Sequence, residues 1–516
     1  MSGQSQPADI TFIGSGIACT ATLIQLFRKL LNTEQAGNTR PEITVIEKNR
    51  EFWKGIPYGS RSSVNALTIT CVNDFIYEAE RPAFFRWFKE NQNDWETYYR
   101  EHGGITAERW LKNNLPLIAK NDWETVYIPR FIFGWYIHNT IAKLHRQIEE
   151  KQLAKINLIH AEAIDARVTG NKHYEVKLEH PDKSISYIIS RKLVIATGSA
   201  VVKPVDEVNA AQVTYINDIY EPSVPLNIEK VKDALTQTDW VENRNVLIIG
   251  SNASSIELLY LLEGLPQVNG LINNLVLISP SGALPYHIST ETLDEHPTPS
   301  LKALQNKGSY NLKTLVDAAA ADLQPAIKNG ANVAYIATVI GNTLKLMEAL
   351  GDDAKKEFFG IHGMRLSNMF RRSGPEYKAG SQQLADVRKV SFIKGKFIQM
   401  QTRNEGVVLR YEEVSSGTEK TYPLTFKAVI NCSGSDNLDR SASPLIYNLV
   451  HKKLAAMNLS GKGFEVNEHF EAAPNLYIMG PLLGGNMNKL IHFWHLENAS
   501  RLMYLAPYLA NELLKD

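Results

Sequence analysis

The sequence predicts an α/β protein built on two copies of one local pattern, a strand, a glycine turn and a helix. The first copy is ITFIGSGIACT at residues 10–20, where an apolar run ends at Gly14 and an amphipathic helix follows. The second copy is VLIIGSNASSIELL at residues 246–259. Further apolar runs at 43–46 and 275–279 can form the neighbouring strands. Two such units predict two Rossmann-like dinucleotide-binding domains.

Length and composition exclude several classes of protein. The chain has 516 residues, of which 44% are apolar and 21% charged, as in ordinary globular proteins with two or three domains. Its 55 Lys and Arg balance 55 Asp and Glu, so no charge bias favours nucleic acid, a membrane surface or an acidic partner. Because the sequence lacks a leader pattern and a long apolar span, we expect a cytoplasmic protein that is neither secreted nor membrane-spanning.

The three cysteines, Cys19, Cys71 and Cys432, lie far apart in the sequence. Since they form no CxxC pair, we expect neither a metal site of the knuckle type nor the redox-active pair of disulfide reductases. Cys19 comes directly after the first glycine turn, where we expect a small packing residue rather than a redox group. The sequence therefore predicts no metal site.

The first unit has the features of a nucleotide site. Gly14 would make the tight turn, and Gly16 would let the backbone approach a pyrophosphate at the helix N-terminus, where free N–H groups favour an anion. Glu47 ends the second strand and can accept hydrogen bonds from an adenosine ribose. It follows Gly14 by 33 residues, more than the ~20 of the fingerprint. The turn-rich connection at 32–41 accounts for the excess.

Apolar runs and turns divide the rest of the chain. Residues 155–190 favour alternating strands with a hairpin at Gly170-Asn171. Apolar strands that close on glycine turns recur at 193–199 and 428–434. We expect residues 1–215 and 386–516 to form one domain. Residues 216–385, with a helical insertion at 286–385 that shapes the substrate region, would form a second domain inserted in the first.

These motifs resemble, in their order along the chain, those of a known group of FAD/NAD(P)-binding flavoproteins. The group includes aspartate N-monooxygenase, which forms nitrosuccinate, and a urate hydroxylase-like branch, and it is more distantly similar to ornithine and lysine N-monooxygenases. The pieces that carry the resemblance span nearly the whole chain: GSGIAC at 14–19, Glu47, FWKGIPYG at 52–59, YIPRFIFGWY at 127–136, IATG at 195–198, NCSG at 431–434 and LYIMGPLLGG at 476–485.

The resemblance implies an FAD site in the first unit. The pyrophosphate would lie over Gly14–Ala18, including Gly16 and Ile17, with the ribose at Glu47 and Lys48. The segment Gly480–Gly485 would pass close to the isoalloxazine. A flavin needs backbone N–H donors near N1 and O2, and glycine lets the backbone come that close. The cofactor region would also be lined by Tyr58, Pro129, Arg130, Thr197 and Gly198.

The second unit departs from the pattern. Asn252 stands where the second glycine is expected, so its side chain crowds the approach to a pyrophosphate, although Ser254 and Glu257 resemble the second motif of the N-monooxygenases. No acid stands at Ser279, which favours NADP over NAD, but the segment 279–285 supplies no arginine for a 2′-phosphate. NADPH is the expected second cofactor, at a site comprising Gly250, Asn252, Ala253 and Ser254.

The resemblance implies the chemistry of a flavin monooxygenase, in which the cofactor performs the reaction with O2 and the protein binds and orients the substrate. An arginine such as Arg365 could clamp the carboxylate of an amino acid. The catalytic candidates are Asn73, Arg365 and Asn488, within a wider set of Asp74, Arg371, Arg372, Asn486, His492 and His495. Each has a simpler explanation: Arg371-Arg372 is typical of a solvated turn, and His492 and His495 of histidines on a packed helix.

Three functions remain open. The first, favoured by the resemblance, is an FAD- and NADPH-dependent monooxygenase that uses O2 to N-hydroxylate an amine or amino-acid-like small molecule. The second is a flavin oxidase or dehydrogenase that has lost NAD(P)H binding and is reduced by its own substrate, an alternative motivated by Asn252. The third is a non-catalytic flavin-binding protein, for which an intact first turn would have little use.

Overall fold

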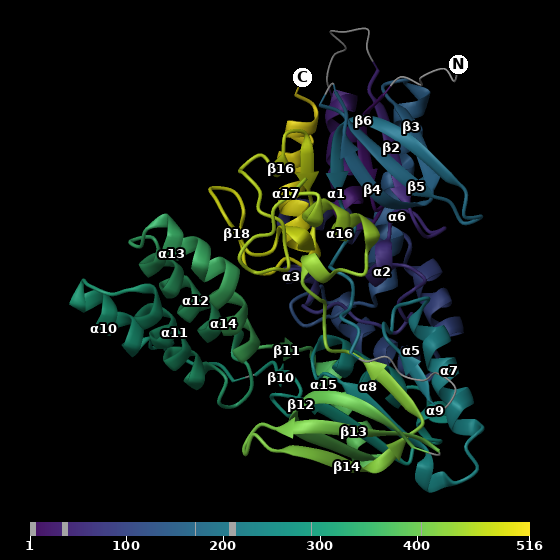
Figure 1. Ribbon diagram of the computed structural model, residues 1–516, viewed down its shortest axis with the longest axis vertical. Helices are drawn as coiled ribbons and strands as arrows, with labels where there is room; N and C mark the ends of the chain where they lie inside the picture. Colours follow the sequence, from purple (N-terminus) through teal and green to yellow (C-terminus); the bar gives the residue numbers. More distant parts are fainter. Residues whose placement is uncertain are drawn as a thin grey trace.

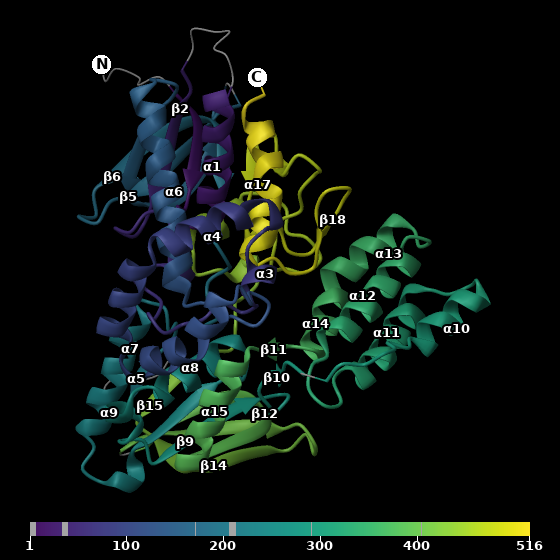
Figure 2. The same cartoon turned by 180° about the vertical axis from the view of Figure 1, so that it is seen from behind.

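Two large β-sheets organise the chain, and each is the centre of one folded unit (Figure 1). The computed structural model describes residues 7–32, 40–170, 172–205, 213–289, 291–403 and 405–515. The first unit holds both the first strand and the last helix of the described chain, and the second unit is inserted between them. A lobe of helices stands to one side of both sheets (Figure 2).

The first sheet has the strand order β16-β17-β6-β1-β2-β3. β1 pairs in parallel with β2 on one side and with β6 on the other, so the carboxyl ends of these strands lie at one edge. α1 buries its apolar face against this sheet and packs beside α6 and α17. The bounds are β1 Ala8–Ile13, α1 Ile17–Asn32, β2 Glu42–Glu47, β3 Lys155–His160, β6 Ile185–Ile195, β16 Glu471–Ala473, β17 Leu476–Ile478 and α17 Ala499–Leu513.

A group of helices follows β2, of which α3 and α5 lie between the two sheets in the ribbon view (Figure 1), whereas α6 packs beside α1. Its longest member, α5, is interrupted at Gly104, whose φ of +58° is outside the helical region. The group is rich in aromatic residues, and Trp95, Trp110 and Phe133 are fully buried. The bounds are α2 Gly55–Tyr58, α3 Val72–Phe75, α4 Arg81–Glu90, α5 Gln92–Ala119 and α6 Arg130–Glu150.

The hairpin expected around Gly170 is confirmed. β4 (Glu162–Val168) pairs antiparallel with β5 (Tyr174–Glu179), and alternate residues of β5, Val176 and Leu178 among them, are buried. Asn171, the second residue of the expected turn, lies outside the described residues, as does most of the connection expected at 32–41.

The second sheet has the strand order β14-β13-β12-β9-β8-β15-β7. Its strands reach residue 431, so the boundary expected at residue 386 is wrong. β12 pairs in parallel with β9, and β15 with β8. A strand-rich pattern alone does not tell which sheet a strand joins. The bounds are β7 Thr214–Ile216, α7 Val224–Thr236, β8 Asn245–Ile249, α8 Ala253–Glu263, α9 Pro266–Asn269, β9 Asn274–Ser279, β12 Lys389–Arg403, β13 Gly406–Glu413, β14 Glu419–Phe426, β15 Ala428–Asn431 and α16 Pro444–His451.

The helical stretch expected at 286–385 forms the lobe and its return to the second unit. The lobe has its own apolar core, which includes Leu315, Val339 and Phe358, and two short paired strands, β10 and β11, connect it to the second unit. Trp494 packs on Phe358 and Phe359 and so ties the lobe to the C-terminal segment. The bounds are β10 Tyr286–His287, α10 Pro299–Lys307, α11 Leu312–Ala326, α12 Val333–Met347, α13 Asp352–Glu357, α14 Gly363–Met369, β11 Arg372–Ser373, α15 Pro375–Val387, β18 Asn486–Met487 and β19 His492–Phe493.

Across the residues that the structure describes, no helix has the length and apolar character needed to span a membrane.

Candidate functional site

The two glycine turns are built in the same way. Gly14 has φ +90° and donates its N–H to the carbonyl of Ile46 at 2.8 Å, and Gly250 has φ +111° and donates to Ile278 at 2.8 Å. In each turn a Cβ would run into the backbone of the next parallel strand, at Ala196 in the first unit and Cys432 in the second. Both positions therefore require glycine, as expected for the tight turn of a nucleotide-binding unit.

The residue after each first glycine reaches the end of the second strand. The N–H and hydroxyl of Ser15 donate to one carboxylate oxygen of Glu47, at 2.9 and 2.8 Å. In the second unit the hydroxyl of Ser251 donates to that of Ser279 at 2.7 Å. Ser279 thus holds the position that Glu47 holds in the first unit. The first turn ends beside a carboxylate and the second beside a neutral hydroxyl.

A loop that includes α2 covers the first turn. An added Cβ on Gly16 would meet only the Cα of Gly55, at 3.6 Å, whereas Gly55 itself has φ +62°. The N–H of Trp53 donates to the Ser15 hydroxyl at 3.2 Å, and its carbonyl accepts from the Thr20 hydroxyl at 2.9 Å. The expected loop at 52–59 is thereby fixed over the N-terminus of α1, where Ile17 and Ala18 begin the helix.

The other glycine segments meet the first turn from two sides. Thr197 lies beside Gly14, and Gly198 follows it with φ +86°. Met479 donates its N–H to Ile195 at 3.0 Å, so Gly480 comes to the start of α1, where an added Cβ would lie 3.1 Å from the Cβ of Ala18. Gly485 instead packs against Ser460 and Asn458, and Lys48 is exposed beyond the strand end.

At the second turn, Asn252 occupies the N-cap position of α8. Its backbone is extended and its side chain makes no capping hydrogen bond, so the first N–H groups of α8 are not satisfied by this cap. Ala253 is exposed and Ser254 is half-buried beside it. This helix N-terminus is therefore open to an anion.

The structure gives Arg130 a partner that sequence analysis missed. Its guanidinium lies 2.7 Å from the carboxylate of Glu257, with only 12% and 5% of the two side chains exposed. Its Nε donates to the carbonyl of Leu67 at 2.7 Å. The hydroxyls of Tyr220 and Tyr377 donate to the two oxygens of Glu257, at 2.9 and 3.3 Å. Burial alone would lower the pKa of Arg130, but Glu257 outweighs it and the pKa is raised.

Tyr58, expected at the cofactor, is buried in an aromatic cluster. Its ring packs edge-on against Phe133 and Phe75, with centroids 4.9 and 6.0 Å apart. Burial raises the pKa of Tyr58 to about 12, although the charge of Arg130 acts in the opposite direction.

Two arginines lie where the lobe joins the second unit. Arg371 and Arg372 were expected in a solvated turn, but Arg372 begins strand β11 and both side chains are half-buried. Burial lowers the pKa of each, offset in part by Glu497 at Arg371 and by Tyr127 and Asp74 at Arg372. Neither arginine makes an ion pair with a described residue. Partly buried guanidinium groups without a carboxylate partner favour an anionic ligand.

Glu497 connects this arginine pair to the first turn, and sequence analysis did not find it. Burial alone would raise its pKa, but His495, Arg371 and a hydrogen bond from Ser199 hold the pKa below its ordinary value. His495 Nε2 lies 3.0 Å from the carboxylate of Glu497. Since Ser199 directly follows Gly198, Glu497 lies at the mouth of the first unit's turn.

Arg501 adds a third cation to the cluster. It extends over the ring of Phe493, 5.2 Å from the centroid, and donates to the carbonyl of His495 at 3.0 Å. Burial and the nearby charge of Arg372 lower its pKa. The arginine cluster, defined as Arg371, Arg372 and Arg501, therefore carries more positive charge than the carboxylates facing it.

The remaining candidate residues differ in whether the structure already gives their side chains a partner. Asn73, in α3, is half-buried beside the exposed Asp74, while Arg365 is exposed on α14 and pairs with no described residue. The amides of Asn486 and Asn488 are already used in packing, because Asn486 donates to the carbonyl of Phe464 at 2.7 Å and Asn488 accepts from the N–H of Ile491 at 2.7 Å. His492 lies in β19 and His495 in the loop after it, so the packed helix expected for them is wrong.

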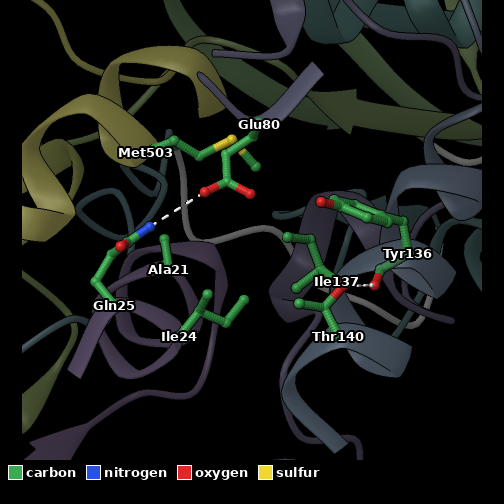
Figure 3. A pocket seen from close by; sticks show the side chains of 8 residues that line it. All are labelled: Ala21, Ile24, Gln25, Glu80, Tyr136, Ile137, Thr140 and Met503. Atoms are coloured by element: carbon green, nitrogen blue, oxygen red, sulfur yellow. Dashed lines mark hydrogen bonds between the residues drawn. The ribbon is translucent and has the colours of Figure 1, made fainter. Parts of the chain in front are cut away.

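A small cavity behind α1 is too small for a ligand. Gln25 donates to Glu80 at 3.2 Å across it, and Tyr136, Ile137 and Met503 close it from α6 and α17 (Figure 3). Its volume of about 10 Å³ is that of a single water molecule at most. It belongs to the packing that holds α1 in place.

The chain is built on two Rossmann-like units, and each has the glycine turn of a dinucleotide-binding fold. Residues 11–200 match the protein family described as FAD-NAD(P)-binding. The chain is 34% identical over 514 residues to uncharacterized protein Rv3403c of Mycobacterium tuberculosis, covering 98% of this chain and 95% of that protein. Uncharacterized protein Mb3437c of Mycobacterium bovis gives the same values. The chain belongs to the family of these mycobacterial proteins.

Solved structures show the same fold over the full length. The cadaverine monooxygenase DfoA of Erwinia amylovora, solved with FAD, is 12% identical, with 99% of this chain and 95% of that chain covered at a TM-score of 0.57. The ornithine N-hydroxylase KtzI of Kutzneria sp. 744 is 13% identical, with 98% and 99% covered at 0.56. The L-lysine 6-monooxygenase of Pseudomonas syringae is 14% identical, with 98% and 99% covered at 0.54.

Proposed function

We propose that the protein is an FAD-dependent monooxygenase that uses NADPH and O2 to N-hydroxylate an amine that carries a carboxylate. The observation that carries this proposal is the arginine cluster at the mouth of an intact first glycine turn. The fold shared with amine and amino-acid N-hydroxylases supports the class of reaction. The finer resemblance to aspartate N-monooxygenase is consistent with a carboxylated substrate.

The residues of the first turn fit FAD. Gly16 has no side chain to occupy the space over the N-terminus of α1, and the N–H groups of Ile17 and Ala18 would bind the pyrophosphate. The carboxylate of Glu47 would accept hydrogen bonds from the ribose of FAD. Gly480 would bring the backbone close to the isoalloxazine ring. When bound, the flavin supplies the reaction with O2, which side chains alone cannot perform.

The protein's own groups would bind the substrate and handle its protons. Arg371 and Arg372 would hold a substrate carboxylate, which would replace the anion that these arginines lack. His495 and Glu497, 3.0 Å apart, form a pair that can hold or pass a proton next to Ser199. Asn73 and Asp74 would complete the wall of the substrate site from α3. Arg365 is replaced by Arg371 and Arg372 as the proposed clamp.

The second unit fits NADPH better than its sequence segment suggested. Lys394 of β12 stands in register beside Ser279 of β9, on the same face of the sheet. The side chain of Lys394 is exposed and forms no ion pair with the described residues. The turn at Gly282 lies so close to Lys394 that a Cβ added to Gly282 would be 2.7 Å from the Cβ of Lys394. We propose that Lys394 and the hydroxyls of Ser251 and Ser279 bind the 2′-phosphate, the role for which the segment 279–285 has no arginine.

Three measurements on the purified protein test the proposal. A visible spectrum with added FAD should show bound flavin, and NADPH should bleach it in the absence of oxygen faster than NADH does. With oxygen admitted, amines that carry a carboxylate, aspartate and ornithine among them, should be screened for a hydroxylamine product, with cadaverine as the carboxylate-free control. Absence of bound flavin after FAD addition would refute the proposal.

The alternative is a flavin oxidase or dehydrogenase reduced by its own substrate. One observation favours it: Asn252 places a side chain at the entrance of the second site, where the pattern has glycine. A bound flavin that neither NADPH nor NADH reduces, but that a carboxylated amine bleaches without oxygen, would establish this alternative.

A further inference from the structure

A second cavity, of about 400 Å³, lies between the two units. Its walls come from the loop at 57–65, from α5 and α6, and from α7 and the end of α8. These helices gather on one side of the molecule, away from the lobe (Figure 2). Neither glycine turn contributes a residue to the lining of this cavity, and no arginine of the arginine cluster does. Its volume is within the range of small-molecule sites, which occur preferentially between domains.

One wall of the cavity is a continuous aromatic surface. Tyr98 of α5 packs with Phe131 and Trp135 of α6, with ring centroids 5.2 and 4.9 Å apart, and Phe131 lies 5.5 Å from Trp135. The ring of His102 stacks on that of Tyr98, with centroids 4.2 Å apart. Ile228 of α7 and Leu261 of α8 face it from the second unit. Flat rings opposite aliphatic side chains favour a flat, apolar ligand body.

Two polar atoms in the lining have no partner among the described residues. Ser62 is only 6% exposed, yet its hydroxyl makes no hydrogen bond, and the side-chain oxygen of Asn65 makes none either. The amide nitrogen of Asn65 is used, since it donates to the carbonyl of Gly103 at 3.0 Å. A buried polar atom without a partner is costly. Each of these oxygens has less than 1 Å² of accessible surface, so its side chain must rotate toward the cavity to accept a hydrogen bond from a ligand donor.

The charged groups of the lining are already neutralised. Glu51 lies 3.0 Å from Lys54 and also accepts from the Ser60 hydroxyl at 2.8 Å. Glu229 lies 2.8 Å from Lys232. A charged ligand would find no free counter-ion here and would lose its hydration, so the lining favours a neutral ligand.

We propose that this cavity is a second ligand site, which binds an uncharged, flat aromatic molecule with at least one N–H or O–H donor. The donor bonds to Ser62 and Asn65, and the ring lies against Tyr98, Phe131 and Trp135. The loop over the cavity already joins the units, because the Nε of Arg61 donates to the carbonyl of Tyr220 at 3.0 Å and the backbone carbonyl of Arg61 accepts from the N–H of Val224 at 2.9 Å. A bound molecule touches both units and resists their separation.

The probe for this site is 5-fluoroindole, which is neutral and flat and has one N–H donor. Binding is measured by 19F NMR on the full-length protein saturated with FAD and NADP+, so that the nucleotide sites are filled. We expect saturable binding. The Ser62→Ala variant should weaken it about fivefold, the effect of one lost hydrogen bond. The probe 5-fluoro-1-methylindole, which lacks the donor, should bind to the wild type with a similar loss.

Two further variants separate the site from general surface binding. Ser60→Ala is the matched control, because Ser60 lines the same cavity but its hydroxyl is occupied by Glu51. It should leave the affinity unchanged. Leu265→Trp should abolish binding by filling the space. Flavin content and thermal unfolding show whether each variant is folded, and if Leu265→Trp is not, the comparison of Ser62→Ala with the methylated probe still decides.

Three results would overturn the proposal. The first is no binding of 5-fluoroindole at millimolar concentration, which would mean that the cavity holds only water. The second is binding that Ser62→Ala and N-methylation leave unchanged. The third is displacement of the probe by FAD or NADP+ in protein not previously saturated, which would place the probe in a nucleotide site instead.

Discussion

Arg130 and Glu257 form a buried ion pair, 2.7 Å long, between the first helix turn of α6 and the middle of α8. One residue belongs to the first unit and the other to the second, so the pair fixes how the two nucleotide-binding units meet. Both charges are withdrawn from water, and each depends on the other to offset that cost. The two tyrosine hydroxyls on Glu257 complete the network.

Breaking this pair should be strongly destabilising. Arg130→Met leaves Glu257 buried without a cation and should lower the free energy of unfolding by about 3–5 kcal/mol. Arg109→Met is the matched control, because Arg109 pairs with Glu263 across the same two units at 2.6 Å, but its side chain is 34% exposed; a loss below about 1 kcal/mol is expected there. Urea unfolding followed by circular dichroism provides the comparison. Equal losses in the two variants would contradict the role given to Arg130.

Substitution of Gly16 should affect FAD binding, whereas substitution of Gly14 should affect folding. Gly16→Ala adds a methyl group that meets only Gly55 at 3.6 Å, so the protein should fold but lose most of its FAD, because the methyl group occupies the path of the pyrophosphate. Gly14→Ala forces a side chain into a positive φ and against Ala196, so it should reduce the yield of folded protein. Flavin absorbance per folded molecule distinguishes them, and full loading of Gly16→Ala would argue against FAD at this turn.

Removing the Lys394 cation should change cofactor preference. Lys394→Ala is expected to weaken NADPH binding about tenfold, the effect of one charge-assisted hydrogen bond, and to leave NADH binding unchanged. Lys396→Ala serves as the control, because Lys396 lies two residues along the same strand and is paired with Glu412 at 2.7 Å. Dissociation constants from titration calorimetry test this. A parallel loss for both nucleotides would place Lys394 away from the 2′-phosphate.

Glu376 should make stability fall as pH rises. Burial raises its pKa to about 7 from 4.5, against hydrogen bonds from its own backbone and from Asn114. Between these two values the folded state holds a proton that the unfolded state has released, so stability decreases across this window and levels off above it. Glu376→Gln should therefore stabilise the protein by about 3 kcal/mol at pH 8 and by nearly nothing at pH 4. Thermal unfolding at both pH values measures the difference, and a gain that does not depend on pH would contradict the shift.

Sequence patterns predicted the parts of the fold that depend on residues close together in the sequence. Gly14 and Gly250 could be found because a positive φ at the end of an apolar strand requires glycine, and the hairpin around Gly170 because its strands alternate. The glycine segment at 480–485 could be placed only by resemblance, and the structure brings Gly480 to Ala18, while Gly485 serves packing.

Pairings between distant elements could not be predicted in this way. The strand β12 has an apolar pattern that fits either sheet, and only its pairing with β9 assigns it to the second. Lys394 stands beside Ser279 for the same reason, far along the chain from the segment 279–285. Glu257 was noticed as part of a motif, but nothing local indicates that Arg130 lies opposite it. Glu497 has no motif at all, and its importance comes from Ser199 and Arg371.

The path of the chain through the two sheets sets an order of assembly. The strand β17 completes the first sheet by pairing with the end of β6, although the whole second unit lies between these two strands in the sequence. During synthesis, the second unit can therefore close while the first still waits for its last strand and for α17. Until residue 478 has emerged from the ribosome, one edge of β6 has unpaired backbone groups that another chain could bind. Chains shortened before this point should aggregate, and those shortened after α17 should not.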